Sequence, residues 1–421
     1  MTILLFTVIF AVFNRRLSIR KTKNRGIKLC GSLFFTPSLL YSFLKNMIKK
    51  SVLFLLIISF FAACGNKPAN TQKTSLADSL QLKYAEGFAV RYFENYKEVI
   101  VYSPWQKGSI YARYYLVNDA ATPTPTDGTK VLIPLKTLAA TSVTHFEFLS
   151  LLGELETINA VCSPKIIYNS EINKRIAEGK ISDLGDAFNI NVEKTLQLKP
   201  NAVMMSGYNQ NDPYAQRVSQ AQIPVIFNNE WMETSLLARA EWIKFVAAFY
   251  DKEQVADSVF ADVDKRYNAI KAKAAGVSKQ PNIMSGSNFR GTWYMPSGRN
   301  FMGKLFADAG SKYFYANDTT AGSLPLHIET VLKNFSQTDV WLNCNFNSLN
   351  ELIQADSKHA LFRPVALKQV YNFNKRLLPS TANDFWESAV ARPDLLLADV
   401  IAILHPDLLP GYELVYAEQL K

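Results

Sequence analysis

The sequence has few of the residues that build reactive or metal-binding centres. It contains four cysteines and four histidines in 421 residues. Cys30 and Cys64 lie near the N-terminus, whereas Cys162 and Cys344 stand alone in distant segments, so no CxxC spacing occurs. A disulfide framework or a thiolate zinc site is therefore not expected. No two histidines are four residues apart, so we expect neither a multi-histidine metal site nor a resident cofactor.

The sequence also lacks the short motifs of several enzyme classes. We find no GxSxG nucleophile turn, no HExxH zinc motif, and neither of the glycine-rich patterns GxxxxGK[ST] and GxGxxG. These motifs place a nucleophile, a zinc ion or a phosphate group where the reaction needs them. Their absence predicts that the protein is not an enzyme.

The first 64 residues contain no Asp or Glu. The formal net charge is +10, but residues 1–64 hold ten Lys and Arg. The remaining 36 basic residues balance 36 acidic ones. The body of the protein therefore carries no excess positive charge that would predict binding to nucleic acid.

The positive N-terminal region ends in a pattern typical of an exported lipoprotein. Residues 47–63 combine a short basic start, a 13-residue apolar stretch and small residues, which predicts a signal peptide. The sequence FAAC ending at Cys64 resembles a bacterial lipobox, so we expect Cys64 to be lipidated and 64–85 to form a tether. A plain secretory signal with an incidental cysteine is the alternative. Residues 1–46 are interpreted as an over-extended start, with a genuine membrane anchor as the alternative.

Beyond the tether, three segments differ in the structure that they predict. Residues 86–130 alternate in polarity and are rich in β-formers, which predicts antiparallel strands followed by a turn-rich linker. Short apolar runs alternate with short helical segments in 131–232 and again in 277–421. This alternation is typical of mostly parallel sheets with helices on their faces, and predicts an N-terminal lobe and a C-terminal lobe.

The segment between the two lobes, residues 233–276, predicts helical structure. Its second part runs without Gly or Pro, and Val255, Val259 and Val263 begin an apolar stripe with steps of three and four residues. A helix of about 24 residues spans roughly 36 Å. Such a helix can join two lobes.

The order of elements repeats in the two lobes, and this repeat carries a resemblance. VEKTLQLKPNAVMM in the first lobe matches IETVLKNFSQTDVWL in the second, with Glu193 and Glu329 at the same place. With the single interlobe helix and the segment WYMPSGRNFMGKLFADAG, the chain resembles the substrate-binding proteins of ABC importers for iron-siderophores, haem and cobalamin. The resemblance covers about 130–421. It implies an α/β fold of two Rossmann-like lobes on one long helix, with the ligand cleft between them and 86–130 as an added β-rich segment.

In that family, each lobe presents a glutamate to an arginine pocket of the permease, and the resemblance assigns this role to Glu193 and Glu329. One exposed carboxylate on each lobe would fix the orientation on a two-fold partner. The alternative is that each is a first-turn glutamate favoured by the helix dipole.

Candidate ligand-binding residues come from the loops that follow the predicted strands, because open α/β sheets bind ligands beyond the carboxyl ends of their strands. The loops are rich in aromatic, amide and arginine side chains, which suit a large flat or anionic ligand. The candidates are His145, Tyr208, Asn209, Trp231, Trp293, Tyr294, Arg299, Asn345 and Trp386. For Trp293 and Trp386, packing between the lobes is the alternative, and for His145 a structural role.

These observations predict a monomeric lipoprotein anchored to the cell envelope and facing the periplasm. The expected partners are a small-molecule ligand, namely an iron chelate, haem or cobalamin, and an inner-membrane ABC permease dimer with its ATPase. Two alternatives stay open: a chelatase-like or hydrolytic enzyme on a similar bilobed frame, and a surface scaffold lipoprotein.

Overall fold

The computed structural model describes residues 76–209, 211–320 and 322–421. The chain divides into two units, Met1–Lys73 and Thr74–Lys421, and all described residues belong to the second. The expected signal peptide and Cys64 therefore lie outside the described residues. Within the described ranges, no helix is both long enough and apolar enough to cross a membrane.

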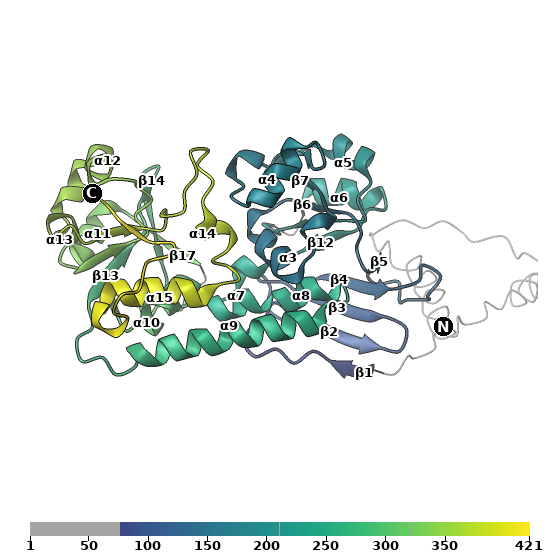
Figure 1. Ribbon diagram of the computed structural model, residues 1–421, viewed down its shortest axis with the longest axis horizontal. Coiled ribbons are helices and arrows are strands. Elements are labelled where there is room, and N and C mark those ends of the chain that lie inside the picture. Colours follow the sequence, from purple (N-terminus) through teal and green to yellow (C-terminus); the bar gives the residue numbers. More distant parts are fainter. Residues whose placement is uncertain (1–75, 210, 321) are drawn as a thin grey trace, which may run out of the picture. The chain divides into compact units, whose positions relative to one another are not determined.

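A five-stranded sheet forms the N-terminal part of the described chain, in the order β1-β2-β3-β4-β5 (Figure 1). Its strands are Leu76–Ser79, Phe88–Phe93, Lys97–Tyr102, Ile110–Val117 and Thr129–Leu132. Neighbours are antiparallel except β4 and β5, which are parallel. The antiparallel strands expected in 86–130 are present, and β1 lies within the expected tether. Residues 76–79 of the expected tether thus form a strand of this sheet.

The N-terminal lobe is built on a parallel sheet in the order β12-β11-β6-β7-β8. Its strands, in chain order from β6, are Leu138–Ala140, Ile158–Val161, Ser182–Asp183, Ala202–Met205 and Val225–Phe227. The two central strands, β6 and β11, are apolar and buried along their whole length, as expected for parallel strands covered on both faces. The lobe's α-helices α3 to α6 are Phe146–Leu152, Ser170–Ala177, Val192–Leu198 and Pro213–Gln220.

The C-terminal lobe has a second sheet, in the order β16-β13-β18-β19-β20. The first four strands are parallel, and β20 is antiparallel to β19. In the order of the sheet, these strands are Lys312–Tyr313, Asn282–Ser285, Val340–Leu342, Val370–Asn372 and Glu418–Gln419. A small antiparallel sheet of β14 (Asn288–Phe289), β15 (Thr292–Pro296) and β17 (Ser323–Leu326) lies beside it. Helices α10 to α15 are Phe301–Asp308, Ile328–Phe335, Leu349–Ala355, Arg363–Ala366, Asp384–Glu387 and Pro393–Leu404.

The long helix α9, Glu253–Ala274, joins the two lobes (Figure 1). Its 22 residues span about 33 Å at about 1.5 Å per residue. Ala256 and Phe260 are buried in the core of the N-terminal lobe, and Val263 and Tyr267 in the core of the C-terminal lobe. The helix expected from the sequence is present, and Val263 of the expected stripe is buried, but in the first turns the buried face is shifted by one residue, to Ala256 and Phe260. Val255, expected in the stripe, is 40% exposed.

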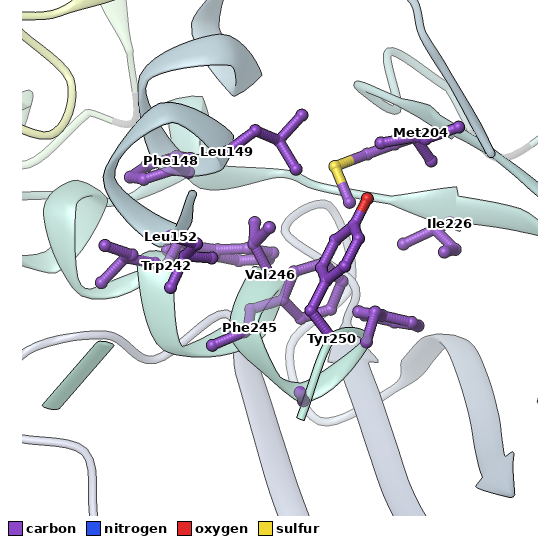
Figure 2. Close-up of a cluster of buried hydrophobic side chains, with 14 of the residues drawn as sticks. Phe148, Leu149, Leu152, Met204, Ile226, Trp242, Phe245, Val246 and Tyr250 are labelled. Carbon is purple, nitrogen blue, oxygen red and sulfur yellow. The ribbon is translucent and has the colours of Figure 1, made fainter. Parts of the chain in front are cut away.

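The N-terminal sheet and the first lobe share one hydrophobic core. Phe88 of β2 packs against Trp242, with ring centroids 4.8 Å apart, and Trp242 packs against Phe245 at 4.9 Å. Figure 2 shows Trp242 and Phe245 in one buried cluster with Leu152 of α3 and Met204 of β11. Trp242 follows α7 (Leu236–Glu241), and Phe245 lies in α8 (Ile243–Ala248). The sheet is therefore integral to this lobe.

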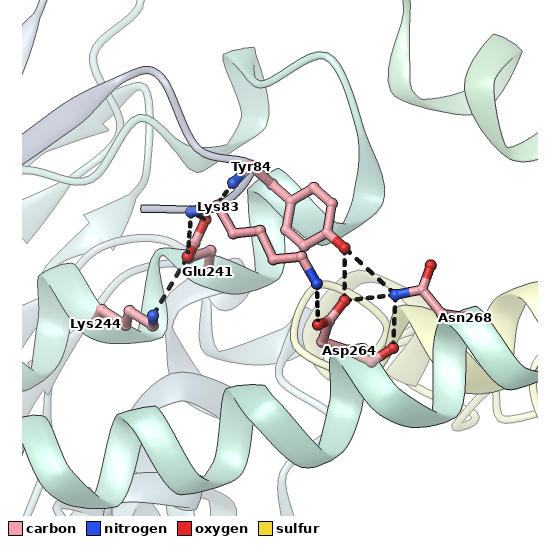
Figure 3. Close-up of polar contacts among 6 residues, drawn as sticks. All are labelled: Lys83, Tyr84, Glu241, Lys244, Asp264 and Asn268. Carbon is pink, nitrogen blue, oxygen red and sulfur yellow. Dashed lines mark hydrogen bonds and ion pairs between the residues drawn. The ribbon is translucent and has the colours of Figure 1, made fainter. Parts of the chain in front are cut away.

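A short strap between β1 and β2 is held by buried carboxylates of the interlobe region (Figure 3). The backbone N–H groups of Lys83, Tyr84 and Ala85 all donate to the carboxylate of Glu241, at N–O distances between 2.8 and 3.2 Å. The Tyr84 hydroxyl donates to Asp264 of α9 at 2.7 Å. Residues 83–85, expected in a tether, are thus fixed to α7 and α9.

Candidate functional site

The two parallel sheets each contain a point where the chain connections leave in opposite directions. In the N-terminal lobe this point lies between β6 and β11, because β6 continues to β7 on one side and pairs with the later β11 on the other. In the C-terminal lobe it lies between β13 and β18. Loops that follow such strands diverge and leave a crevice at the carboxyl edge of the sheet, where α/β proteins bind ligands.

A cavity of about 1010 Å³ occupies this edge of the N-terminal lobe. Thr141 and Ser142, which follow β6, line it together with Ser206, Tyr208 and Asn209, which follow β11. Candidates Tyr208 and Asn209 therefore lie where the strand-end argument expected them. Trp386 of α14, from the other lobe, also lines the cavity, so both lobes contribute to it.

Aromatic side chains form one wall of this site. The ring of Tyr208 lies between Phe188 and Trp231, with centroids 5.6 and 5.5 Å away. Phe188 is 82% exposed and Trp386 is 49% exposed, so both present apolar surface to solvent. Phe188 lines the cavity from the hairpin of β9 (Gly185–Asp186) and β10 (Asn189–Ile190). Sequence reasoning missed Phe188, although a phenylalanine at a polar hairpin tip is a signal for such a role.

A second cavity, of about 600 Å³, lies at the carboxyl edge of the C-terminal sheet. It is lined by the candidates Tyr294 and Asn345, and also by Asn343 and Ser287. The Asn345 side chain donates to the Ser287 hydroxyl at 3.2 Å, which ties the loop after β18 to the loop after β13. Asn343 and Asn345 have φ of 56° and 59°, a left-handed conformation that asparagine adopts more readily than most residues. Amide and hydroxyl side chains thus make up much of the lining of the second cavity.

The one arginine among the candidates, Arg299, contributes to neither cavity. It is exposed at the start of α10. Among the described residues lining the larger cavity, the charged ones are Asp212 and Arg217. The Asp212 carboxylate accepts from Ala215 N at 2.9 Å and caps α6.

The structure corrects the placement of two further candidates. Trp293 is fully buried, donates its indole N–H to Ser285 O at 2.9 Å, and packs on Trp341 with centroids 5.4 Å apart. It is a core residue because its side of β15 faces the interior, whereas its neighbour Tyr294 faces outward. His145 is also fully buried, and this burial lowers its pKa to about 3. Its ring is therefore neutral at physiological pH. His145 also lines neither cavity.

Glu193 and Glu329 occupy equivalent positions in the two lobes. Each is the second residue of its helix, α5 and α11, and each is exposed. A backbone N–H and Lys358, whose Nζ lies 3.2 Å from the carboxylate, lower the pKa of Glu329. Both helices lead into inner strands of their sheets, β11 and β18. The repeat read from the sequence thus places one exposed carboxylate on each lobe.

A contact between the lobes next to the larger cavity was not foreseen from the sequence. The Glu387 carboxylate of α14 accepts from the backbone N–H groups of Tyr168 and Asn169, the latter at 2.9 Å, before α4. Burial raises the pKa of Glu387 to about 7 despite these donors. Burial and the nearby Asp384 also raise the pKa of Glu147 in α3 to about 7. Two carboxyls with raised pKa values therefore meet where the lobes touch.

Within the described ranges, no group of three or more His, Cys, Asp or Glu side chains is placed to hold a metal ion. Cys162 lines the larger cavity, and burial raises the pKa of its thiol to about 12. The thiol is therefore protonated at neutral pH.

The comparison with protein families identifies the class of this chain. A model of the periplasmic binding protein family matches residues 138–371, which is more than half of the chain. The chain belongs to this family, and the resemblance stated from the sequence is confirmed. The members of this family are binding proteins, which agrees with the fold and the cavities described above.

Two relatives of this chain are named lipoproteins. Lipoprotein MJ0878 of Methanocaldococcus jannaschii is 25% identical over 246 residues, which cover 58% of this chain and 57% of that protein. Lipoprotein MJ0872 of the same organism is 22% identical over 402 residues, covering 87% and 97%. This chain thus spans little more than half of MJ0878 but nearly all of MJ0872.

Two solved structures show the same fold. A periplasmic haem-binding protein from Pseudomonas aeruginosa has a TM-score of 0.52 at 14% identity, covering 68% of this chain and 98% of that chain. The siderophore-binding protein FeuA from Bacillus subtilis, solved with ferri-bacillibactin, has a TM-score of 0.50 at 17% identity, covering 66% and 97%. The expected fold of two α/β lobes joined by a long helix is confirmed.

Proposed function

We propose that this protein captures a small molecule with an extended ring system between its two lobes and delivers it to an ABC permease. The observation that carries the proposal is the larger cavity, which lies at the carboxyl edge of the N-terminal sheet and is also lined by Trp386 of the other lobe. A ligand in this cavity would contact both lobes.

The lining supports a ligand that offers flat apolar surface and hydrogen-bonding groups. Tyr208, Phe188 and Trp386 provide rings on which a macrocycle or a catechol could stack. Asn343 and Asn345 of the second cavity provide amides that could orient polar substituents. Haem, a corrinoid and an iron–siderophore complex all have this character, and the structural neighbours that bind haem and ferri-bacillibactin support the same classes.

Attachment to the cell envelope through Cys64 is part of the proposal. The FAAC sequence supports it, as do two relatives that are named lipoproteins. The exposed pair Glu193 and Glu329 would then dock on the permease, one lobe on each half of a two-fold partner.

The test is a titration of the purified full-length protein in detergent with haemin, cyanocobalamin and ferric enterobactin, followed by absorbance and tryptophan fluorescence. We expect saturable binding of one probe class. Trp386→Ala should weaken that binding by about 2- to 12-fold, because an aromatic contact contributes about 0.5–1.5 kcal/mol beyond burial. Phe314→Ala is the matched control, since Phe314 is another exposed ring of the same lobe (60%) that lines neither cavity. Equal loss in both variants, or saturable binding of no probe, would refute the proposal.

A further inference from the structure

We infer that Tyr111 of the N-terminal sheet is a positioning residue for the ligand loop Gly207–Asn209, so that this sheet forms part of the binding site. The inference rests on the proposed function, because the loop carries two residues of the larger cavity. Tyr111 lies outside 138–371, the part of the chain that matches the family model. It is contributed by the segment that was expected to be only an addition to the fold.

The first observation is a direct bond from the sheet to the loop. Tyr111 lies near the start of β4, and its hydroxyl donates to the backbone carbonyl of Asn209 at 2.8 Å. Asn209 and Tyr208 both line the cavity. Burial raises the pKa of Tyr111 to about 12, so the hydroxyl keeps the proton that it donates throughout the neutral pH range.

The second observation is the close approach of the Tyr111 ring to Gly207. A Cβ atom added to Gly207 would lie 2.7 Å from the Tyr111 hydroxyl oxygen and 3.0 Å from two ring carbons. Side-chain atoms essentially never approach this closely, so the ring fills the space that any larger residue at 207 would need. On its other side, Gly207 N donates to the Asn229 side chain at 2.7 Å. The loop is therefore held between the lobe and the sheet.

The third observation is that Tyr111 is itself held in place. Its ring packs edge-on against Phe227 of β12, with centroids 4.8 Å apart, and against Trp105 at 5.4 Å. Three residues further along β4, the Tyr114 hydroxyl accepts from Phe227 N at 2.9 Å. Tyr111 and Tyr114 of β4 thus fix the N-terminal sheet to β12. The Tyr111 hydroxyl therefore has little freedom to move away from Asn209.

These contacts reach the ligand surface through Tyr208. Its ring lies between Phe188 and Trp231 and forms part of the aromatic wall. If the Tyr111 bond is lost, the backbone on either side of Tyr208 loses one of its two anchors. The ring then samples more positions, and binding must pay the entropy of ordering it again.

The test compares Tyr111→Phe with Tyr115→Phe. Tyr115 lies on the same strand, and its hydroxyl donates to Asp127 at 2.6 Å, away from the ligand loop. Each change removes a tyrosine hydroxyl and the bond that it donates, and keeps the ring; Tyr115→Phe also removes the acceptor of a 3.5 Å bond from Arg113. We expect Tyr111→Phe to weaken binding of the haemin, cyanocobalamin or ferric enterobactin probe by about 2- to 10-fold, the range of one hydrogen bond. Tyr115→Phe should bind as the wild type does, with a melting temperature lowered as much or more.

A second pair of variants tests the contact between the ring and the glycine. Gly207→Ala should weaken binding because the added methyl group displaces the loop from the Tyr111 ring. The same change in a Tyr111→Ala background should cost much less, since the ring is gone, and this coupling identifies the contact. Additive effects of the two changes would contradict the inference.

Hydrogen exchange of the unliganded protein gives a readout that needs no ligand. Peptides covering 205–212 should exchange faster in Tyr111→Phe than in the wild type or in Tyr115→Phe. If the wild type binds none of the three probes, the proposed function fails, and the exchange rates alone decide on the positioning role. Unchanged exchange overturns the inference, and so does faster exchange in a variant that binds a probe as well as the wild type does.

Discussion

The strap that crosses the interlobe region offers a sharp test of how the N-terminal segment is held. Glu241 is fully buried, and its carboxylate accepts from three successive backbone N–H groups at residues 83–85. Lys244 lies 3.3 Å from the same carboxylate. In Glu241→Gln, one oxygen becomes an NH₂ group that cannot accept, and the negative charge is lost.

The expected cost follows from these contacts. The amide oxygen of Gln can take the place of Oε2 and still accept from all three N–H groups. The NH₂ group then faces two other donors, the Lys83 N–H at 3.0 Å and the Lys244 Nζ at 3.3 Å, and this loss of an acceptor costs about 1–3 kcal/mol. Lys244, which is 12% exposed, also loses its charge partner Glu241. Because Lys244 keeps a second carboxylate, Asp257, at the same distance of 3.3 Å, its charge stays paired and this loss adds about 1 kcal/mol. The free energy of unfolding should fall by about 2–4 kcal/mol in total.

Urea unfolding monitored by circular dichroism measures this change. Asp264→Asn is the matched control, because it also removes a carboxylate that holds the strap, through the Tyr84 hydroxyl and the Lys83 side chain. Lys83 is exposed and Asp264 lies nearer the surface, so the control should cost less than the Glu241 change. Limited proteolysis should cut Glu241→Gln, but not the control, between β1 and β2. A Glu241→Gln protein as stable as the wild type would refute the assignment of the carboxylate as the anchor of the strap.

Three further predictions concern other parts of the chain. Because the pKa of Glu147 and that of Glu387 are raised to about 7, the folded protein binds protons more tightly than the unfolded chain. Stability should therefore fall as the pH rises from about 5 to about 8, by on the order of 3 kcal/mol for each carboxyl, and Glu147→Gln should flatten this dependence in thermal melts at several pH values. Replacing both Glu193 and Glu329 with Ala should abolish uptake in cells while leaving ligand affinity unchanged; normal uptake would contradict permease docking. Cys64→Ser should prevent lipidation. Detection of a diacylated Cys64→Ser protein by mass spectrometry would contradict the lipobox assignment.

The architecture could be predicted because it depends on local patterns. Short apolar runs that alternate with helical segments indicate parallel strands, and the interlobe helix follows from a long stretch without Gly or Pro. Gly153 follows the last residue of α3 with a φ of 75°, the left-handed conformation in which glycine commonly ends helices. Such signals depend on a few neighbouring residues and need no knowledge of distant contacts.

The direction in which a side chain points could not be predicted with the same success. On β15, Trp293 and Tyr294 are adjacent, so the alternation of a strand puts one inside and the other outside. The sequence does not say which face meets the core, and Trp293 is the buried one. On α9, the buried face is set by contacts with two lobes at once. Val255 and Ala256 are neighbours, and only packing decides that Ala256 is the one buried.

The contacts between distant segments could not be read from the sequence at all. Tyr111 and Asn209 are 98 residues apart, and Glu387 and Asn169 are 218 apart. Neither pair belongs to a motif, and each forms only because two sheets or two lobes pack together. The N-terminal segment therefore looked like an addition to the fold, whereas its core and its hydrogen bonds make it part of the first lobe.

Helix α14 links the ligand cavity to the contact between the lobes. Trp386 lines the larger cavity, and the next residue, Glu387, accepts from the backbone before α4 on the opposite lobe. Because the two side chains are adjacent on a four-residue helix, neither can shift far without moving the other. At the far end of the lobe contact, α9 is buried in both cores and tied to the strap. Along α9, buried packing thus fixes the position of the two lobes. Next to the cavity, their position depends on the hydrogen bonds of Glu387 in α14, the helix that also carries Trp386.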